Sequence, residues 1–242
     1  MKKVWIDGGH GGKDPGAVGN GLKEKDIALR ISQGVKQRLE AEYEGVQVQL
    51  SRSTDVFLEL KERTYAANKA GADLLVSIHC NAGGGEGGFE SFRYTSASSA
   101  SRSLSLQNVL HTEIMAALKP YNVRDRGQKA ANLHMVRESK MPAVLTENLF
   151  IDVASDAAKL KRQDVIDALI TGHVVGIAKY LGLKQKEGKS MDKERDINVV
   201  SPWAASAWEA ATKQGYFDGS RPGAAITREE MAVVIMRMES KK

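Results

Sequence analysis

The chain begins with an apolar run that stops in a glycine-rich loop: Val4-Trp5-Ile6-Asp7-Gly8-Gly9-His10-Gly11-Gly12-Lys13-Asp14-Pro15-Gly16-Ala17. The run is typical of a short strand, and its glycines let the loop bend sharply. Glu24 follows in the next loop, and His79 follows a second apolar run, residues 74–78. At the carboxyl edge of one sheet, two imidazoles and a carboxylate can hold a catalytic zinc and leave a fourth position open for water. The pattern favours a hydrolase.

Each of these features has a simpler interpretation when it is taken alone. The loop could cradle a phosphate or only turn the chain, although it has neither the spacing of a dinucleotide-binding motif nor a Walker lysine. His10 could be a structural or solvent-facing histidine, and His79 could be a satisfied core histidine. Glu24 could be a carboxylate favoured at a helix N-terminus. Their joint position at strand ends makes a shared site the stronger hypothesis.

Strand-like and helical patterns alternate over about the first 183 residues. Apolar side chains recur at helical spacing in the segments that we expect to be helices, residues 27–39, 58–69, 101–118 and 165–181. Short apolar or alternating runs predict strands over residues 4–6, 46–50, 74–78, 89–94, 135–136 and 143–146. This order predicts an α/β fold with a mostly parallel, twisted sheet flanked by helices on both faces.

The composition is that of a soluble globular protein. The 242 residues are 42% hydrophobic and 27% charged, and no apolar run approaches the roughly 20 residues of a membrane span. Asp7 interrupts the N-terminal apolar stretch, so we expect no signal peptide and synthesis in the cytoplasm. The single cysteine, Cys80, excludes an internal disulfide, and we expect it to be buried beside His79. A net charge of +5 and a pI near 9.2 favour adhesion to polyanions, including nucleic acid or anionic cell-wall polymers.

A series of motifs in a fixed order gives the chain a family resemblance. Besides the opening loop, the motifs are Glu24-Lys25-Asp26, Ser51-Arg52-Ser53-Thr54-Asp55, Leu60-Lys61-Glu62-Arg63, Ala67-Asn68, Ala72-Asp73, Ser77-Ile78-His79-Cys80-Asn81-Ala82 and Pro142-Ala143-Val144-Leu145-Thr146-Glu147. Over residues 1–182 the chain resembles the zinc-dependent N-acetylmuramoyl-L-alanine amidases of the amidase-3 type. The resemblance implies that His10, Glu24 and His79 bind Zn²⁺, and it matches Glu147 to the family's second glutamate.

The chemistry of amide hydrolysis explains why such residues are needed. Zinc lowers the pKa of its bound water to about 7 and polarises the carbonyl group. A carboxylate that is not a metal ligand must then take the proton of the water and pass it to the leaving amine. Glu147 suits this role because it follows the apolar run 143–145, where burial would raise its pKa. The alternative is a surface carboxylate that caps the next helix.

Several polar residues outside this set are candidates for binding substrate. Arg126 and Arg137 could meet peptide carboxylates through charge-assisted hydrogen bonds. His134 and Asn81 are further candidates for substrate contact.

The remaining polar residues have structural interpretations. Candidates for orienting the metal ligands are Asp7, Asp14 and Asn81. Arg52 and Arg63 could also meet peptide carboxylates, but we favour their pairing with Asp55 or Glu62. We expect His111 to be exposed and His173 to be structural.

A composition change predicts three parts: a catalytic domain over residues 1–183, a charged linker over residues 184–195, and a small, mainly helical module over residues 196–242. The last part is similar to a single S-layer-homology repeat, with its Val200-Ser201-Pro202-Trp203-Ala204 opening and Ile226-Thr227-Arg228-Glu229-Glu230 element. The resemblance implies binding to anionic secondary cell-wall polymers. Self-association is an alternative use, and Trp203 and Trp208 could instead be core residues.

Together these features imply a peptidoglycan hydrolase that cuts the amide bond between N-acetylmuramic acid and L-alanine. A phage or prophage endolysin that reaches the cell wall after release is the favoured interpretation, and a host autolysin of the same activity is the alternative. A catalytically silent wall-binding protein and a zinc peptidase of the stem peptide are competing classes. We expect neither nucleic acid nor a membrane as a partner.

Overall fold

The computed structural model describes residues 1–95, 100–186, 209 and 212–214. Chain contacts divide the protein into two units, Met1–Lys186 and Glu187–Lys242. The first unit extends three residues beyond the expected boundary, because Tyr43 forms a β-bridge with Gln185 and the backbone N–H of Lys186 donates to Glu42. The rest of the predicted linker and nearly all of the predicted module at 196–242 lie outside the described residues.

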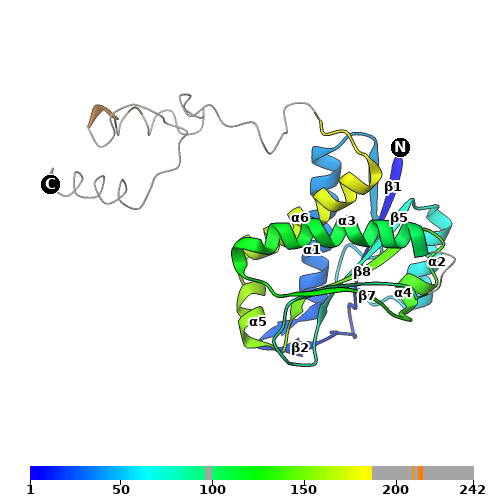
Figure 1. Ribbon diagram of the computed structural model, residues 1–242, viewed down its shortest axis with the longest axis horizontal. Coiled ribbons are helices and arrows are strands. Elements are labelled where there is room, and N and C mark those ends of the chain that lie inside the picture. Colours follow the sequence, from blue (N-terminus) through cyan, green and yellow to red (C-terminus); the bar gives the residue numbers. More distant parts are fainter. Residues whose placement is uncertain (96–99, 187–208, 210–211, 215–242) are drawn as a thin grey trace. The chain divides into compact units, whose positions relative to one another are not determined.

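A six-stranded sheet forms the centre of the first unit (Figure 1). Its order is β4 (Val46–Leu50), β1 (Lys2–Gly8), β5 (Leu74–Asn81), β8 (Ala143–Phe150), β6 (Phe89–Arg93) and β7 (Asp125–Ala130). All neighbouring pairs are parallel except β6 and β8. The prediction of a mostly parallel sheet is therefore confirmed. Two short strands, β2 (Val18–Gly19) and β3 (Leu22–Lys23), form a separate hairpin.

Helices cover both faces of this sheet, as the sequence predicted (Figure 1). One face packs against α1 (Glu24–Glu42), α3 (Ala100–Leu118) and α6 (Gln163–Leu181). The other face packs against α2 (Leu60–Ala70) and α4 (His134–Arg137). The remaining helical segments are α5 (Ala154–Leu160) and the 3-10 turn Lys119–Tyr121.

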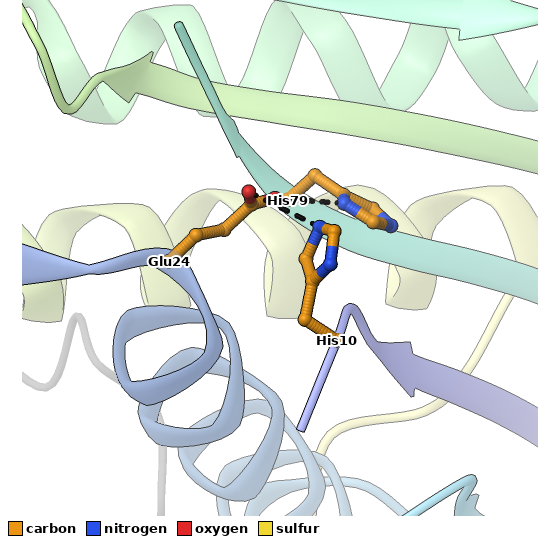
Figure 2. Close-up of side chains that lie close together, drawn as sticks. All are labelled: His10, Glu24 and His79. Atoms are coloured by element: carbon orange, nitrogen blue, oxygen red, sulfur yellow. Dashed lines mark hydrogen bonds and ion pairs between the residues drawn. The ribbon is translucent and has the colours of Figure 1, made fainter. Parts of the chain in front are cut away.

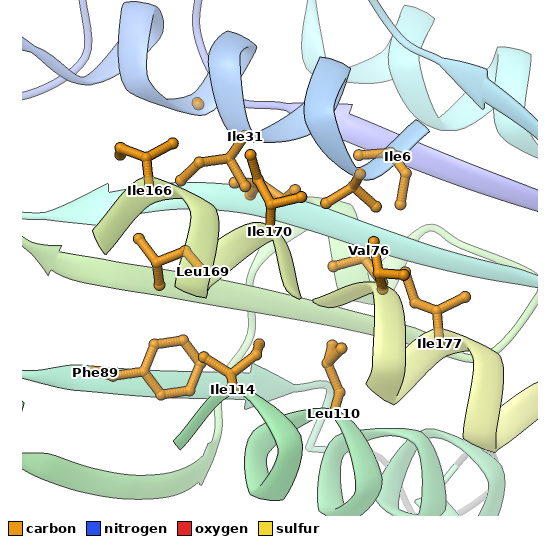
Figure 3. Packing of buried hydrophobic residues seen from close by; sticks show 14 of the residues in the cluster. Ile6, Ile31, Val76, Phe89, Leu110, Ile114, Ile166, Leu169, Ile170 and Ile177 are labelled. Atoms are coloured by element: carbon orange, nitrogen blue, oxygen red, sulfur yellow. The ribbon is translucent and has the colours of Figure 1, made fainter. Parts of the chain in front are cut away.

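Alternation along the strands divides the core into two layers. Ile6 and Val76 point into the layer under α1 and α6, where Figure 3 shows them with Ile31 and Ile177. Their neighbours Trp5 and Leu75 point into the opposite layer. Strands buried on both faces explain why these segments read as continuous apolar runs.

Two expectations about the elements are wrong. Met135 and Val136 belong to the helix α4, and their side chains are buried against the sheet. His111 is buried in α3, where its ring contacts Ser91 and Asp125. The buried Cys80 and the buried His173 agree with their predictions. None of the helices in the described part of the chain is long and apolar enough to be a membrane span.

Candidate metal centre

Three side chains that are distant in sequence converge at the carboxyl edge of the sheet. His10 lies in the loop after β1, Glu24 is the first residue of α1, and His79 lies near the end of β5. Their candidate ligand atoms all lie within 4.8 Å of one another. His10 Nε2 is 3.1 Å from Glu24 Oε2, and His79 Nδ1 is 2.8 Å from Glu24 Oε1. Figure 2 shows both imidazole rings directed at the same carboxylate.

Glycines make this close approach possible. A Cβ at Gly9 would collide with the His79 ring, and a Cβ at Gly16 would collide with Glu24 and His10. His10 itself has a positive φ of 60°, a conformation that is uncommon for a residue with a side chain. The loop therefore needs contacts that hold His10 in this conformation.

Two buried arginines supply such contacts. Arg63 donates to the carbonyl groups of Gly8 and His10 at 2.8 and 2.6 Å, and it pairs with the buried Asp7 at 3.0 Å. Arg52 donates to the carbonyl groups of Gly8 and Gly9 at 2.9 and 2.7 Å. The expectation that these arginines pair with Asp55 or Glu62 is therefore wrong. Both guanidinium groups instead fasten the backbone that carries the first candidate ligand.

Further hydrogen bonds orient the candidate ligands. Asp14 Oδ2 lies 2.8 Å from His10 Nδ1, which leaves Nε2 directed at Glu24. The backbone N–H groups of Ala17 and Cys80 donate to the Glu24 carboxylate at 2.8 and 3.1 Å. Asp14 thus has the contact expected of an orienting residue. Asp7 acts on the loop through Arg63 rather than on a histidine.

The charges of the three residues are tightly linked. Burial opposes ionisation of Glu24, but hydrogen bonds from His10 and His79 hold its pKa well below the usual range. Burial likewise lowers the pKa of His10, but its bonds to Glu24 and Asp14 outweigh this effect and raise the pKa to about 9. The pKa of His79 is raised against the effect of burial by its hydrogen bond to Glu24.

Glu147 lies beside this cluster on the next strand. It pairs in register with His79 on β5 and with Glu90 on β6. Its Oε2 atom is buried and has no hydrogen-bond partner among the described residues. Burial raises the pKa of Glu147 to about 7, and the charges of Glu24 and Glu90 add to the effect. A carboxyl group with a pKa near neutrality is suited to accept and return a proton. The strand continues to Phe150, so Glu147 caps no helix.

The donor set fits zinc. Two imidazole nitrogens and one carboxylate oxygen are ligands that catalytic zinc sites use, and three protein ligands leave one position open. The bonds of Asp14 to His10, and of two backbone N–H groups to Glu24, are of the kind that orients metal ligands.

Two of the substrate-binding candidates, Asn81 and Arg126, meet at one buried carboxylate near Glu147. Asn81 Nδ2 and Arg126 Nε donate to Glu90 at 2.7 and 2.8 Å. Lys129 donates to the same carboxylate at 2.5 Å. Neither Glu90 nor Lys129 was predicted from the sequence. The alternation along Phe89–Arg93 could have placed Glu90 on the sheet face opposite to the buried Phe89, which is the face that carries Glu147.

The other two candidates have separate contacts. His134 Nε2 lies 3.2 Å from Thr64 Oγ1, next to Arg63 on α2. Arg137 donates to Asn132 and pairs with Glu138. Neither residue contacts the cluster of His10, Glu24 and His79 through a hydrogen bond that the structure describes.

Comparison with known proteins agrees with this geometry. Residues 4–179 match the family Amidase_3, described as N-acetylmuramoyl-L-alanine amidase. The chain belongs to this family. A similar sequence is the endolysin of Bacillus phage SPP1, which is 51% identical over 195 residues, or 81% of this chain and 72% of that protein. The sporulation-specific N-acetylmuramoyl-L-alanine amidase of Bacillus subtilis is 46% identical over 80% of this chain and 73% of that protein.

Solved structures of amidase catalytic domains share the fold. The catalytic domain of CwlV, an N-acetylmuramoyl-L-alanine amidase from Bacillus (Paenibacillus) polymyxa var. colistinus, superimposes with a TM-score of 0.70 at 37% identity. The match covers 76% of this chain and all of that domain. The sheet and its flanking helices are therefore those of an amidase catalytic domain.

Proposed function

We propose that this member of the amidase family hydrolyses the amide bond between N-acetylmuramic acid and L-alanine of peptidoglycan at a zinc centre formed by His10, Glu24 and His79. The observation that carries the proposal is the convergence of these three ligand types within 4.8 Å, beside a carboxyl group whose pKa is about 7. Bound at this centre, zinc would lower the pKa of water to about 7 and withdraw charge from the scissile carbonyl.

Other residues of the chain would transfer the proton and hold the metal ligands in place. Glu147 takes the proton from the attacking water and returns it to the leaving nitrogen of L-alanine. The buried Oε2 atom has no hydrogen-bond partner in the described part of the chain, so it is free for this exchange, and a pKa of about 7 lets the group both accept and release a proton near neutral pH. Asp14 holds the His10 ring in one orientation, while Arg63 and Arg52 fix the backbone beneath it.

Product analysis tests this proposal. Purified peptidoglycan is digested with the native protein, and the new termini are identified by mass spectrometry. We expect free L-alanine amino termini and no new glycan reducing ends. New termini within the stem peptide would indicate a peptidase, new reducing ends would indicate a glycosidase, and no products would support a silent wall-binding protein.

The biological setting is a second part of the proposal. We favour a lytic role at the cell wall after release, as in an endolysin, because a phage endolysin is 51% identical to this chain. A host autolysin is the alternative, since a Bacillus subtilis amidase is 46% identical. Residues 196–242 would then bind an anionic cell-wall polymer or a second copy of the chain, an interpretation that rests on their similarity to an S-layer-homology repeat.

A further inference from the structure

A row of side chains crosses three neighbouring strands at the candidate site. His79 on β5 pairs in register with Glu147 on β8, and Glu147 pairs with Glu90 on β6. Side chains of directly paired residues lie on the same face of a sheet. The row therefore leads from the metal centre, past the proton-transfer group, to Glu90.

The row ends in a group with an excess of positive charge. The side chain of Glu90 is only 4% exposed, and both Arg126 and Lys129 of β7 pair with its Oε2 atom, at 2.8 and 2.5 Å. Asn81 occupies the other oxygen, Oε1. One cation would be enough to neutralise one carboxylate, so two cations leave a net charge of +1. This charge can be reached from solvent, because the side chains of Arg126 and Lys129 are 27% and 40% exposed.

The opposite side of the metal centre has different chemistry. A cavity of about 280 Å³ lies there against His10 and His79, among residues that follow β1 and β4. Its lining includes Phe57, Leu58 and Leu60, and also the carboxylates of Asp7, Asp14 and Glu59.

The one arginine in the lining of this cavity offers little to an anion. The guanidinium of Arg63 already donates to Leu58, Asp7, Gly8 and His10. Glu59 in the wall is exposed, so its carboxylate would repel an acidic peptide, whereas an uncharged sugar meets no such penalty.

We propose that Arg126 and Lys129 form a subsite for a free carboxylate on the second residue of the stem peptide. The proposal rests on the proposed function, and it adds the direction of the substrate: the peptide extends over β6 and β7, and the glycan lies towards the cavity beside His10. Glu90 is a positioning residue that holds the two cations side by side, and Asn81 holds Glu90.

The dimensions of sheet and substrate agree with this assignment. The cationic nitrogens contact Glu90, one strand away from Glu147, and neighbouring strands are about 4.8 Å apart. An extended peptide advances about 3.5 Å per residue, so a carboxylate on the second residue lies roughly 7 Å from the scissile nitrogen. A hydrogen bond of about 2.8 Å between that carboxylate and a cationic nitrogen then spans the rest of the way from the scissile nitrogen, beside Glu147, to Arg126 or Lys129.

The test compares two substrates that differ at one group. N-Acetylmuramoyl-L-alanyl peptides carry either D-glutamate, with a free α-carboxylate, or D-isoglutamine, its α-amide, at the second position. We expect wild-type kcat/KM to favour the acid by roughly tenfold, the effect of one charge-assisted hydrogen bond. Lys129→Gln should remove most of this preference, and Arg126→Gln should act in the same way.

Lys36→Gln is the matched control. Lys36 is 38% exposed and pairs with Glu40, as Lys129 pairs with Glu90, but it lies in the middle of α1, about 18 Å along the helix from Glu24. This variant should keep the wild-type preference. Equal cleavage of acid and amide by the wild type, or an unchanged preference in Lys129→Gln, would overturn the proposal.

Calorimetry with the released peptides separates this proposal from the proposed function. Binding of L-alanyl-D-glutamyl and L-alanyl-D-isoglutaminyl peptides needs no turnover, so it reports on the subsite even in a protein that cleaves neither substrate. We expect the wild type to bind the acid about tenfold more tightly than the amide, and Lys129→Gln to lose most of this difference. Equal affinity of the wild type for both peptides would refute the subsite, whereas absence of cleavage alone would refute the amidase activity.

Discussion

At the scale of single residues, Glu147 combines a catalytic advantage with a cost in stability. The Oε2 atom of its carboxyl group is buried and has no hydrogen-bond partner among the described residues, so ionisation is unfavourable in the folded protein. The pKa is about 7 in the folded state and 4.5 in the ordinary state. The folded protein therefore binds more protons between these values, and its free energy of unfolding falls as pH rises from about 4.5 to about 7.

The substitution Glu147→Gln replaces the carboxyl group with an amide that does not ionise. In metal-free protein, we expect the variant to be as stable as the wild type near pH 4 and more stable above pH 7, by on the order of 1–3 kcal/mol. Urea denaturation at several pH values measures the difference. Glu44→Gln, at an exposed position, is the matched control. A constant difference between Glu147→Gln and wild type at all pH values would contradict the raised pKa.

Asp14 makes a separate prediction about metal affinity. Its carboxylate accepts from His10 Nδ1 and so leaves Nε2 as the ligand atom. Asp14→Asn should raise the dissociation constant for zinc by about 10–100-fold, because the ring orientation is no longer fixed. Competition with a chromophoric chelator measures this constant. Asp152→Asn, which removes a carboxylate that binds the Gly83 and Gly84 amides elsewhere, should not change it.

The positions of the candidate ligands could be predicted from the sequence because each lies after a strand, near a strand end or at a helix start. The roles of Arg52, Arg63 and Glu90 could not. Their partners are backbone carbonyl groups or side chains from distant elements, and only the folded chain brings them together.

At the scale of elements, helix packing depends on a glycine in α6. A Cβ at Gly172 would collide with the backbone of Ile114 in α3, so the two helices approach closely at this point. Gly172→Ala should therefore destabilise the protein by about 1–3 kcal/mol, despite the better helix propensity of alanine. Gly34→Ala in α1 is the control.

The three atoms nearest to a Cβ at Gly34 belong to the side chain of Ile170, which can shift more easily than the backbone atom that a Cβ at Gly172 would meet. Chemical denaturation of both variants measures the difference. Equal stability of Gly172→Ala and Gly34→Ala would contradict the close contact between α3 and α6.

The elements also show where sequence patterns stop being informative. Strand β7 reads Asp125-Arg126-Gly127-Gln128-Lys129-Ala130, and it has no apolar alternation because it lies at the edge of the sheet. Met135-Val136 are apolar enough for a strand but form one turn of helix. Polar residues around His111 in the sequence indicated an exposed side chain. In the structure the side chain is buried, and both ring nitrogens form hydrogen bonds, to Ser91 and Asp125.

At the scale of the whole molecule, the structure places the complete candidate site within the unit Met1–Lys186. A protein truncated after Lys186 keeps the bridge between Tyr43 and Gln185. We expect it to cleave soluble muropeptides at the full-length rate but to sediment less with intact cell walls, because residues 196–242 are missing. Undiminished sedimentation would assign wall binding to the catalytic unit.

The central claim is that hydrolysis depends on zinc held by His10, Glu24 and His79 with Glu147 as the proton-transfer group. It is tested most directly by titrating chelated protein with zinc while bound metal and the release of L-alanine amino termini are measured in the same samples. We predict that the rate rises in proportion to bound zinc and reaches its maximum at one ion per chain. Glu147→Gln should bind the same zinc but lose about 10²–10⁴-fold in rate. A full hydrolysis rate in the chelated protein, or in Glu147→Gln, would contradict the account.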